Sequence, residues 1–154
     1  MKGFVSSVVF VVVIAFLAAM FPQQALAAGA PADRVIVMYF HRTERCPTCL
    51  TIGGYCEEAV KRGFPQQLIS GTLEFHYIDY QDKKNARLAK AYGVNAPALI
   101  VAKVANNKVL KVSQLNDMWT KAREKKAFLE YVRDAVAGYL KPARRPQPKT
   151  RRTR

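Results

Sequence analysis

Two cysteines directly follow an apolar run, and this junction constrains the fold more than any other feature of the sequence. Residues 35–40 are apolar at every position, which is typical of a strand buried on both faces. Residues 47–62 then predict a helix, because Pro47 suits a first helical turn, where a missing N–H costs nothing. Cys46 and Cys49 should therefore lie at a helix N-terminus, where unpaired N–H groups and a partial positive charge stabilise a thiolate.

The expected position of the cysteine pair predicts thiol–disulfide chemistry. We expect Cys46 to have a lowered pKa and to act as the nucleophile. Cys49, one turn further into the helix, can close a disulfide with Cys46 or resolve a mixed disulfide. Arg42 and Arg45 add positive charge that would lower the pKa of Cys46 further. His41 is predicted to be a packing residue at the strand end, with proton handling near the dithiol as the alternative.

The third cysteine, Cys56, is predicted to be a buried core residue, since a free cysteine buries readily. It would lie on the same helix face as Cys49, about 10 Å further along the helix axis. The two sulfurs could then not share one small metal ion, and closed zinc sites need four converging ligands. We therefore predict no metal and no other cofactor, with a thiolate site for a metal or arsenite as a less favoured alternative.

The remaining sequence predicts the order strand, helix, strand, helix, hairpin, helix. Right-handed crossovers would make the first two strands parallel, with helices on both faces of one sheet. Chemistry in such sheets lies at the carboxyl ends of the strands, where Cys46 is expected. The expected elements are a strand over 73–78, a helix over 82–92 that stops at Gly93, strands over 98–104 and 108–112 around a turn at Asn106-Asn107, a short helical piece at Met118-Trp119, and a last helix with Phe128, Val132, Ala135, Val136 and Tyr139 on one face.

The chain resembles the thioredoxin superfamily over roughly residues 34–140. The resemblance rests on Cys46-Pro47-Thr48-Cys49 after a buried strand, on Ile78-Asp79 at the end of the second strand, and on Tyr92-Gly93-Val94-Asn95-Ala96-Pro97, which is similar to the family's Tyr-Gly-Val-x-x-Pro. It implies an α/β fold with a central mixed four-stranded sheet and helices on both faces. It also implies that the Ala96–Pro97 bond is cis and that Pro97 faces the dithiol.

The resemblance therefore adds Pro97 to Cys46 and Cys49 as the predicted catalytic set. Pro97 would shape a substrate groove. Further residues expected to bind substrate or to modulate the dithiol lie next to this set: His41, Arg45, Pro47, Thr48 and Ala96.

A narrower resemblance concerns the motif Tyr-Phe-His-x-Thr-x-Arg-Cys-Pro-Thr-Cys-Leu-Thr-Ile and a later Leu-Asn-Asp-Met-Trp. Together they are similar to small secreted thioredoxin-like proteins labelled as the nitrophenyl compound nitroreductase subunit ArsF family. We take that label as a name, because the residues form no flavin or nicotinamide motif. Ordinary thioredoxins commonly have Trp where this chain has Arg45, and a buried acid where it has Phe40, six positions before Cys46. These departures favour an oxidant, an isomerase or a partner-specific relay over a general reductase.

The two ends of the chain predict export and a basic tail. Residues 1–27 have the features of a secretory signal, with Lys2, an apolar run over 8–21 and a small-x-small site that ends at Ala27. We expect cleavage after Ala27; the alternative is an uncleaved membrane anchor. The cleaved and the anchored form would both be exported to a periplasmic or other extracytoplasmic compartment. Disulfides persist in such compartments. Residues 28–33 would be a linker, and residues 141–154 a disordered basic tail.

The charge of the chain lies largely in that tail. Seven of the 25 basic residues follow Leu140, so the domain itself is only modestly basic against 11 acidic residues. The tail is predicted to be solubilising, with attachment to an anionic membrane surface as the alternative. Export and the lack of a nucleic-acid-reading motif argue against a nucleic-acid partner.

The sequence thus predicts an exported, monomeric thiol–disulfide oxidoreductase whose partner is a protein thiol or disulfide. The alternative is a non-enzymatic accessory subunit that uses the same surface to dock a partner. The direction of electron transfer is left open.

Overall fold

The computed structural model describes residues 31–141. The predicted signal segment 1–27, the first half of the predicted linker 28–33 and all but the first residue of the predicted tail 141–154 lie outside the described residues. No helix in the described part of the chain is long and apolar enough to cross a membrane.

Four strands form one mixed sheet with the order β2-β1-β3-β4. The central strand β1 pairs parallel with β2 and antiparallel with β3, and β3 pairs antiparallel with β4. The predicted four-stranded mixed sheet is therefore confirmed. The strands are β1 (Arg34–His41), β2 (Leu73–Asp79), β3 (Ala98–Ala105) and β4 (Lys108–Gln114).

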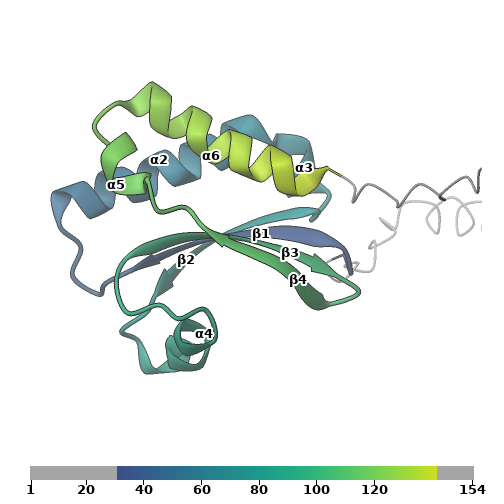
Figure 1. Ribbon diagram of the computed structural model, residues 1–154, viewed down its shortest axis with the longest axis horizontal. Coiled ribbons are helices and arrows are strands. Elements are labelled where there is room, and N and C mark those ends of the chain that lie inside the picture. Colours follow the sequence, from purple (N-terminus) through teal and green to yellow (C-terminus); the bar gives the residue numbers. More distant parts are fainter. Residues whose placement is uncertain (1–30, 142–154) are drawn as a thin grey trace, which may run out of the picture.

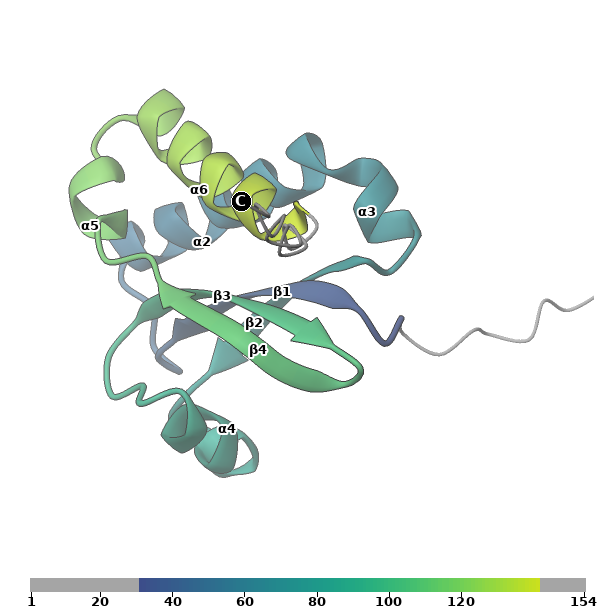
Figure 2. The same cartoon turned by 45° about the vertical axis from the view of Figure 1, so that its right-hand side comes forward.

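Helices cover both faces of the sheet, as predicted. One face carries α2 (Pro47–Gly63), α3 (Pro65–Ile69), α5 (Met118–Lys121) and α6 (Lys125–Leu140), as Figure 1 shows. The opposite face carries η1 (Lys83–Asn85) and α4 (Ala86–Ala91), which are seen below the sheet in Figure 2. This arrangement of helices around the strand order β2-β1-β3-β4 is a thioredoxin-like α/β fold.

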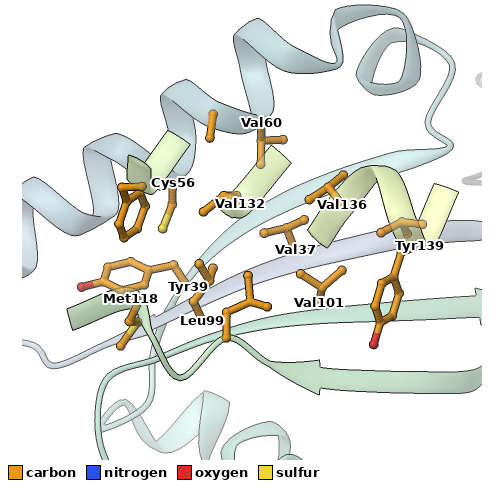
Figure 3. Close-up of a cluster of buried hydrophobic side chains, with 14 of the residues drawn as sticks. Val37, Tyr39, Cys56, Val60, Leu99, Val101, Met118, Val132, Val136 and Tyr139 are labelled. Carbon is orange, nitrogen blue, oxygen red and sulfur yellow. The ribbon is translucent and has the colours of Figure 1, made fainter. Parts of the chain in front are cut away.

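The strand β1 divides the core into two layers, because successive side chains of a strand point to opposite faces. Val35, Val37 and Tyr39 face α2 and α6, where Cys56 is also buried (Figure 3). Met38 and Phe40 face the smaller layer on the α4 side. The predicted stripe on the last helix is confirmed, with Phe128, Val132, Val136 and Tyr139 all buried.

The predicted turns have the backbone conformations that the sequence indicated. Asn106 and Asn107 adopt φ values of 50° and 58° and connect β3 to β4 in a tight hairpin. Gly93 ends α4 with φ of 66°, in the left-handed region that glycine adopts without a Cβ penalty. The helix predicted over 82–92 instead begins with the 3₁₀ turn η1, because the Asp82 carboxylate accepts the N–H of Lys84 and holds a tight first turn.

The predicted cis bond before Pro97 is wrong. No peptide bond between residues 31 and 141 is cis, so the Ala96–Pro97 bond is trans. The trans isomer of an X–Pro bond is favoured by about 0.5–1 kcal/mol unless surrounding contacts hold the cis form. Gly93 already reverses the chain after α4, and the segment reaches β3 with trans bonds throughout.

Candidate active site at the start of helix α2

The dithiol lies where the sequence predicted, at the junction between β1 and α2. Cys46 is the N-cap of α2, with φ of −67° and ψ of 161°, and Pro47 follows in the first turn. The Cys46 Sγ accepts a hydrogen bond from the backbone N–H of Cys49 at 3.2 Å. The two Sγ atoms are 2.8 Å apart, and both thiols are free. A sulfur thus takes the capping position that a Ser or Asp oxygen usually occupies.

The two thiols differ in both exposure and acidity. Cys46 is exposed, whereas the side chain of Cys49 is buried. Hydrogen bonds from the Cys49 thiol and the Cys49 N–H to the Cys46 sulfur lower the pKa of Cys46. Burial, and then the hydrogen bond to Cys46, raise the pKa of Cys49. The geometry therefore makes Cys46 the exposed and more acidic thiol, and Cys49 the sheltered and less acidic one.

The arginines near the pair act differently from the sequence expectation. The Arg45 guanidinium stacks over the ring of Tyr77, 5.5 Å from the ring centroid. The Arg42 Nε donates to the Tyr80 hydroxyl at 3.1 Å. The lowered pKa of Cys46 comes chiefly from hydrogen bonds made by Cys49, rather than from these positive charges.

Tyr39 lies between the dithiol and the sheet core and holds the backbone of Cys49. The sequence analysis did not predict this role. Its side chain is fully buried, and its hydroxyl donates to the backbone carbonyl of Cys49 at 2.9 Å. Burial raises the pKa of Tyr39, so the phenol stays protonated and remains a donor. Phe40, which takes the position where ordinary thioredoxins commonly have a buried acid, lies in the core layer on the other side of the sheet. The two-residue alternation of β1 was the available signal, although an all-apolar strand does not show which face the helix covers.

The predicted modulating residues around Pro97 lie at the same end of the sheet as the dithiol loop. Ala98 pairs with Phe40, so Pro97 enters β3 beside the carboxyl end of β1. Pro97 is partly buried, and Ala96 before it is exposed. The His41 ring donates through Nδ1 to the Arg42 carbonyl at 2.8 Å and packs near Tyr77, with ring centroids 6.1 Å apart. His41 is thus placed as a packing residue at the strand end.

A hollow of about 440 Å³ lies beside the dithiol on the α5 side. It is lined by Pro47, Thr48, Thr51, Trp119, Ala122 and Arg123. Sequence analysis placed Pro47 and Thr48 at the site but assigned no role to Trp119 or Arg123. Trp119 is the single tryptophan of the chain, and that was the signal in the sequence that could have drawn attention to this side.

Cys56 is separate from the dithiol, as the sequence predicted. Its side chain is fully buried in the core between α2 and the sheet (Figure 3). Burial raises the pKa of its thiol far above the ordinary value, which keeps it protonated and unreactive. Within residues 31–141, no three His, Cys, Asp or Glu side chains form a cluster that could hold a metal ion.

Comparisons with known proteins give structural neighbours but no family. No family model matches the chain, and no curated protein matches it. A solved thioredoxin from Fasciola hepatica is similar at 22% identity and a TM-score of 0.42, over 69% of this chain and 81% of that chain. A structure described as a malarial protein is similar at 21% identity and a TM-score of 0.36, over 60% of this chain and 97% of that chain. The thioredoxin-like fold follows from the strand order β2-β1-β3-β4 and from the placement of the helices on both faces.

Proposed function

We propose that this chain is an exported thiol–disulfide oxidoreductase with Cys46 as nucleophile and Cys49 as resolving cysteine. One observation carries the proposal: the exposed Cys46 sulfur caps α2, where it accepts the Cys49 N–H at 3.2 Å and lies 2.8 Å from the Cys49 sulfur. A thiolate stabilised in this way is both an accessible nucleophile and a good leaving group.

The exchange proceeds in two displacements. The Cys46 thiolate attacks one sulfur of a partner disulfide, a mixed disulfide forms, and the other partner sulfur leaves as a thiolate. Cys49 then gives up its proton and attacks the Cys46 sulfur, which closes the Cys46–Cys49 disulfide and releases the second partner thiolate. Two electrons pass from the dithiol to the partner disulfide, and the two partner thiolates take up protons. The reverse sequence oxidises a partner dithiol, and the compartment's redox poise decides the direction.

A trapping experiment tests the division of labour between the cysteines. Cys49→Ser should accumulate a mixed disulfide through Cys46 when the reduced protein meets bis(2-hydroxyethyl) disulfide, because no thiol remains to resolve it. Cys46→Ser should abolish exchange. Cys56→Ser is the matched control and should exchange like the unmodified protein. Mass spectrometry identifies the trapped cysteine, and trapping through Cys56 would refute the proposal.

The other outcome of that experiment is the accessory role that the sequence left open. A dithiol that exchanges with no disulfide would leave a thioredoxin-like surface used for docking alone. The narrower likeness to the nitrophenyl compound nitroreductase subunit ArsF family rests on sequence motifs, and we propose no nitroreduction from it.

Export is a separate part of the proposal and rests on residues 1–27. The apolar run and the Ala25-Leu26-Ala27 site predict a mature chain that begins at Ala28. Mass spectrometry of the exported protein should show the loss of residues 1–27. Intact residues 1–27 in a membrane fraction would replace cleavage with anchoring.

A further inference from the structure

The hollow on the α5 side is placed to hold whatever approaches the dithiol. The two residues between the cysteines, Pro47 and Thr48, form part of its wall. The opposite wall comes from α5 and the turn that follows it, and both Figure 1 and Figure 2 place α5 beside the start of α2. A segment lying in this hollow therefore passes directly beside Cys46.

Trp119 gives this hollow an aromatic wall, carried on a helical turn that is anchored to the core. Its side chain is 43% exposed, although neighbouring Met118 is 2% exposed and anchors α5 in the core. The backbone N–H of Asp117, at the start of α5, donates to the Tyr131 hydroxyl of α6 at 3.2 Å. An exposed tryptophan on an anchored turn is a common kind of anchor residue at an interface.

Arg123 supplies the only charge in the lining of this hollow. Arg123 takes part in none of the ion pairs among the described residues. The basic residues in those pairs are Arg34, Lys61, Arg62, His76, Lys84 and Lys125. On the other side of the dithiol, Arg42 and Arg45 have the aromatic partners Tyr80 and Tyr77 rather than carboxylates. Glu44 lies in that same loop beside Arg42, and the Asp79 carboxylate bonds to Thr43 of the loop, so both offset positive charge there. On the α5 side, the Glu124 carboxylate accepts the backbone N–H groups of Lys126 and Ala127 at the start of α6. The lining of the hollow itself therefore carries the positive charge of Arg123, which attracts an anionic group.

We propose that the hollow binds an extended segment of a partner protein that carries an acidic side chain close to its reacting cysteine. The acidic side chain would pair with Arg123, and an apolar side chain of the same segment would lie against Trp119. This inference rests on the proposed exchange at Cys46 and adds to it the class of substrate. Charge complementarity selects this occupant over a basic segment, since like charges at an interface repel.

Peptide disulfides test the charge preference. Two short peptides each carry one cysteine as a mixed disulfide with thionitrobenzoate and one Leu, and differ only in having Glu or Lys two residues from the cysteine. The reduced full chain should release thionitrobenzoate faster from the Glu peptide by about two- to fivefold, the range expected for an exposed ion pair. The preference should shrink as salt is added, because exposed charges are screened.

Variants assign the preference to the hollow. Arg123→Gln should remove the preference for the Glu peptide, and Trp119→Ala should slow both peptides equally. Arg87→Gln removes an exposed arginine on α4, on the other face of the sheet, and should leave all rates unchanged. Equal rates for the two peptides, or a preference that survives Arg123→Gln, would overturn the inference.

Two further substrates separate the possible failures. If the unmodified chain does not react even with the neutral bis(2-hydroxyethyl) disulfide, the proposed function itself fails. If that disulfide reacts normally but Arg123→Gln slows only glutathione disulfide, the hollow serves a small anionic thiol, and the inference of a protein segment is wrong.

Discussion

The Tyr39 hydroxyl donates a 2.9 Å hydrogen bond to the backbone carbonyl of Cys49. This bond joins the central strand β1 to the first turn of α2, directly beneath the buried cysteine of the pair. Because Tyr39 contacts the backbone of Cys49 rather than its sulfur, it acts on exchange by holding Cys49 in position.

The first prediction concerns this hydrogen bond. Tyr39→Phe should lower the free energy of unfolding by about 1 kcal/mol, the typical net value of one intramolecular hydrogen bond. It should also slow the attack of Cys49 on a mixed disulfide by up to about fivefold, since about 1 kcal/mol corresponds to that factor. Alkylation of Cys46 should be unchanged. Stopped-flow resolution of a preformed mixed disulfide measures the second step by itself.

Tyr55→Phe is the matched control for that variant. Tyr55 lies on the same helix, packs its ring on Phe128 and is partly buried. Its substitution should leave the resolution rate unchanged. Equal slowing in both variants would show that the effect comes from general loosening of α2 rather than from the Tyr39 hydrogen bond.

The second prediction contrasts two neighbouring glycines of α2. A Cβ at Gly53 would lie 2.9 Å from Tyr77 Cε1 and 3.0 Å from Tyr39 Cε1, whereas a Cβ at Gly54 would meet nothing within 4 Å. Tyr39 cannot move aside easily, because it is buried and bonded to Cys49. Gly53→Ala should therefore be destabilising, since overpacking costs about 1–3 kcal/mol. Gly54→Ala should stabilise by up to about 1 kcal/mol through helix propensity.

Urea unfolding of the reduced protein checks this pair of glycine variants. The midpoint should fall for Gly53→Ala and rise for Gly54→Ala, with the same slope in both cases. A rise in both variants would mean that the Tyr39 and Tyr77 rings can move away from α2 at little cost.

Much of the fold follows from local sequence signals. The alternation and length of apolar runs predicted all four strands, and the Phe128–Val132–Val136 spacing predicted the buried face of α6. The Asn106-Asn107 turn and the Gly93 stop were predictable because few residues tolerate positive φ. Only the structure shows which of the two glycines Gly53 and Gly54 makes a close contact, since a Cβ would meet Tyr77 and Tyr39 at Gly53 and nothing within 4 Å at Gly54.

The remaining features depend on three-dimensional packing that the sequence does not encode locally. Comparison with thioredoxins drew attention to Phe40, but the β1 residue that bonds to the backbone of the dithiol is its neighbour Tyr39. Arg45 was close to Cys46 in sequence, yet its guanidinium stacks on Tyr77 from a strand 32 positions away. The isomer of the Ala96–Pro97 bond likewise depends on its surroundings and not on the motif.

The third prediction concerns Cys56, which is fully buried in the core beside Tyr39. Cys56→Ser places a hydroxyl there and should lower the free energy of unfolding by about 1–3 kcal/mol. Cys56→Ala avoids the polar group and tests the loss of packing alone. Both variants should retain disulfide exchange below their unfolding midpoints. Loss of exchange in the folded Cys56→Ala protein would show that the Cys46–Cys49 pair is not the whole reacting group.

The fourth prediction uses the opposite pKa shifts of the two reacting thiols. Cys46 has a lowered pKa because Cys49 donates hydrogen bonds to its sulfur, and Cys49 has a raised pKa because it is buried. Iodoacetamide should therefore alkylate Cys46 first, with a midpoint below the free-cysteine value of about 8.5. Cys49 should react only at higher pH, and the buried Cys56 last. Peptide mapping at each pH gives the three profiles, and a shared midpoint for Cys46 and Cys49 would refute the assigned roles.

The same shifts set the sign of the pH dependence of stability in the reduced protein. Between the lowered folded pKa of Cys46 and its unfolded value, the unfolded chain binds more protons, so the free energy of unfolding rises with pH. That contribution is complete above the unfolded pKa and is lost as pH falls through the folded pKa. Cys49 acts oppositely: its contribution is complete below the unfolded pKa and is lost as pH rises through the raised folded pKa. The reduced protein should thus reach its highest thiol-dependent stability near the unfolded cysteine pKa. The oxidised protein keeps only the buried Cys56 thiol and should lack the rise in stability with pH below that value. Urea unfolding of both forms across this pH range measures the difference, and parallel curves would contradict the prediction.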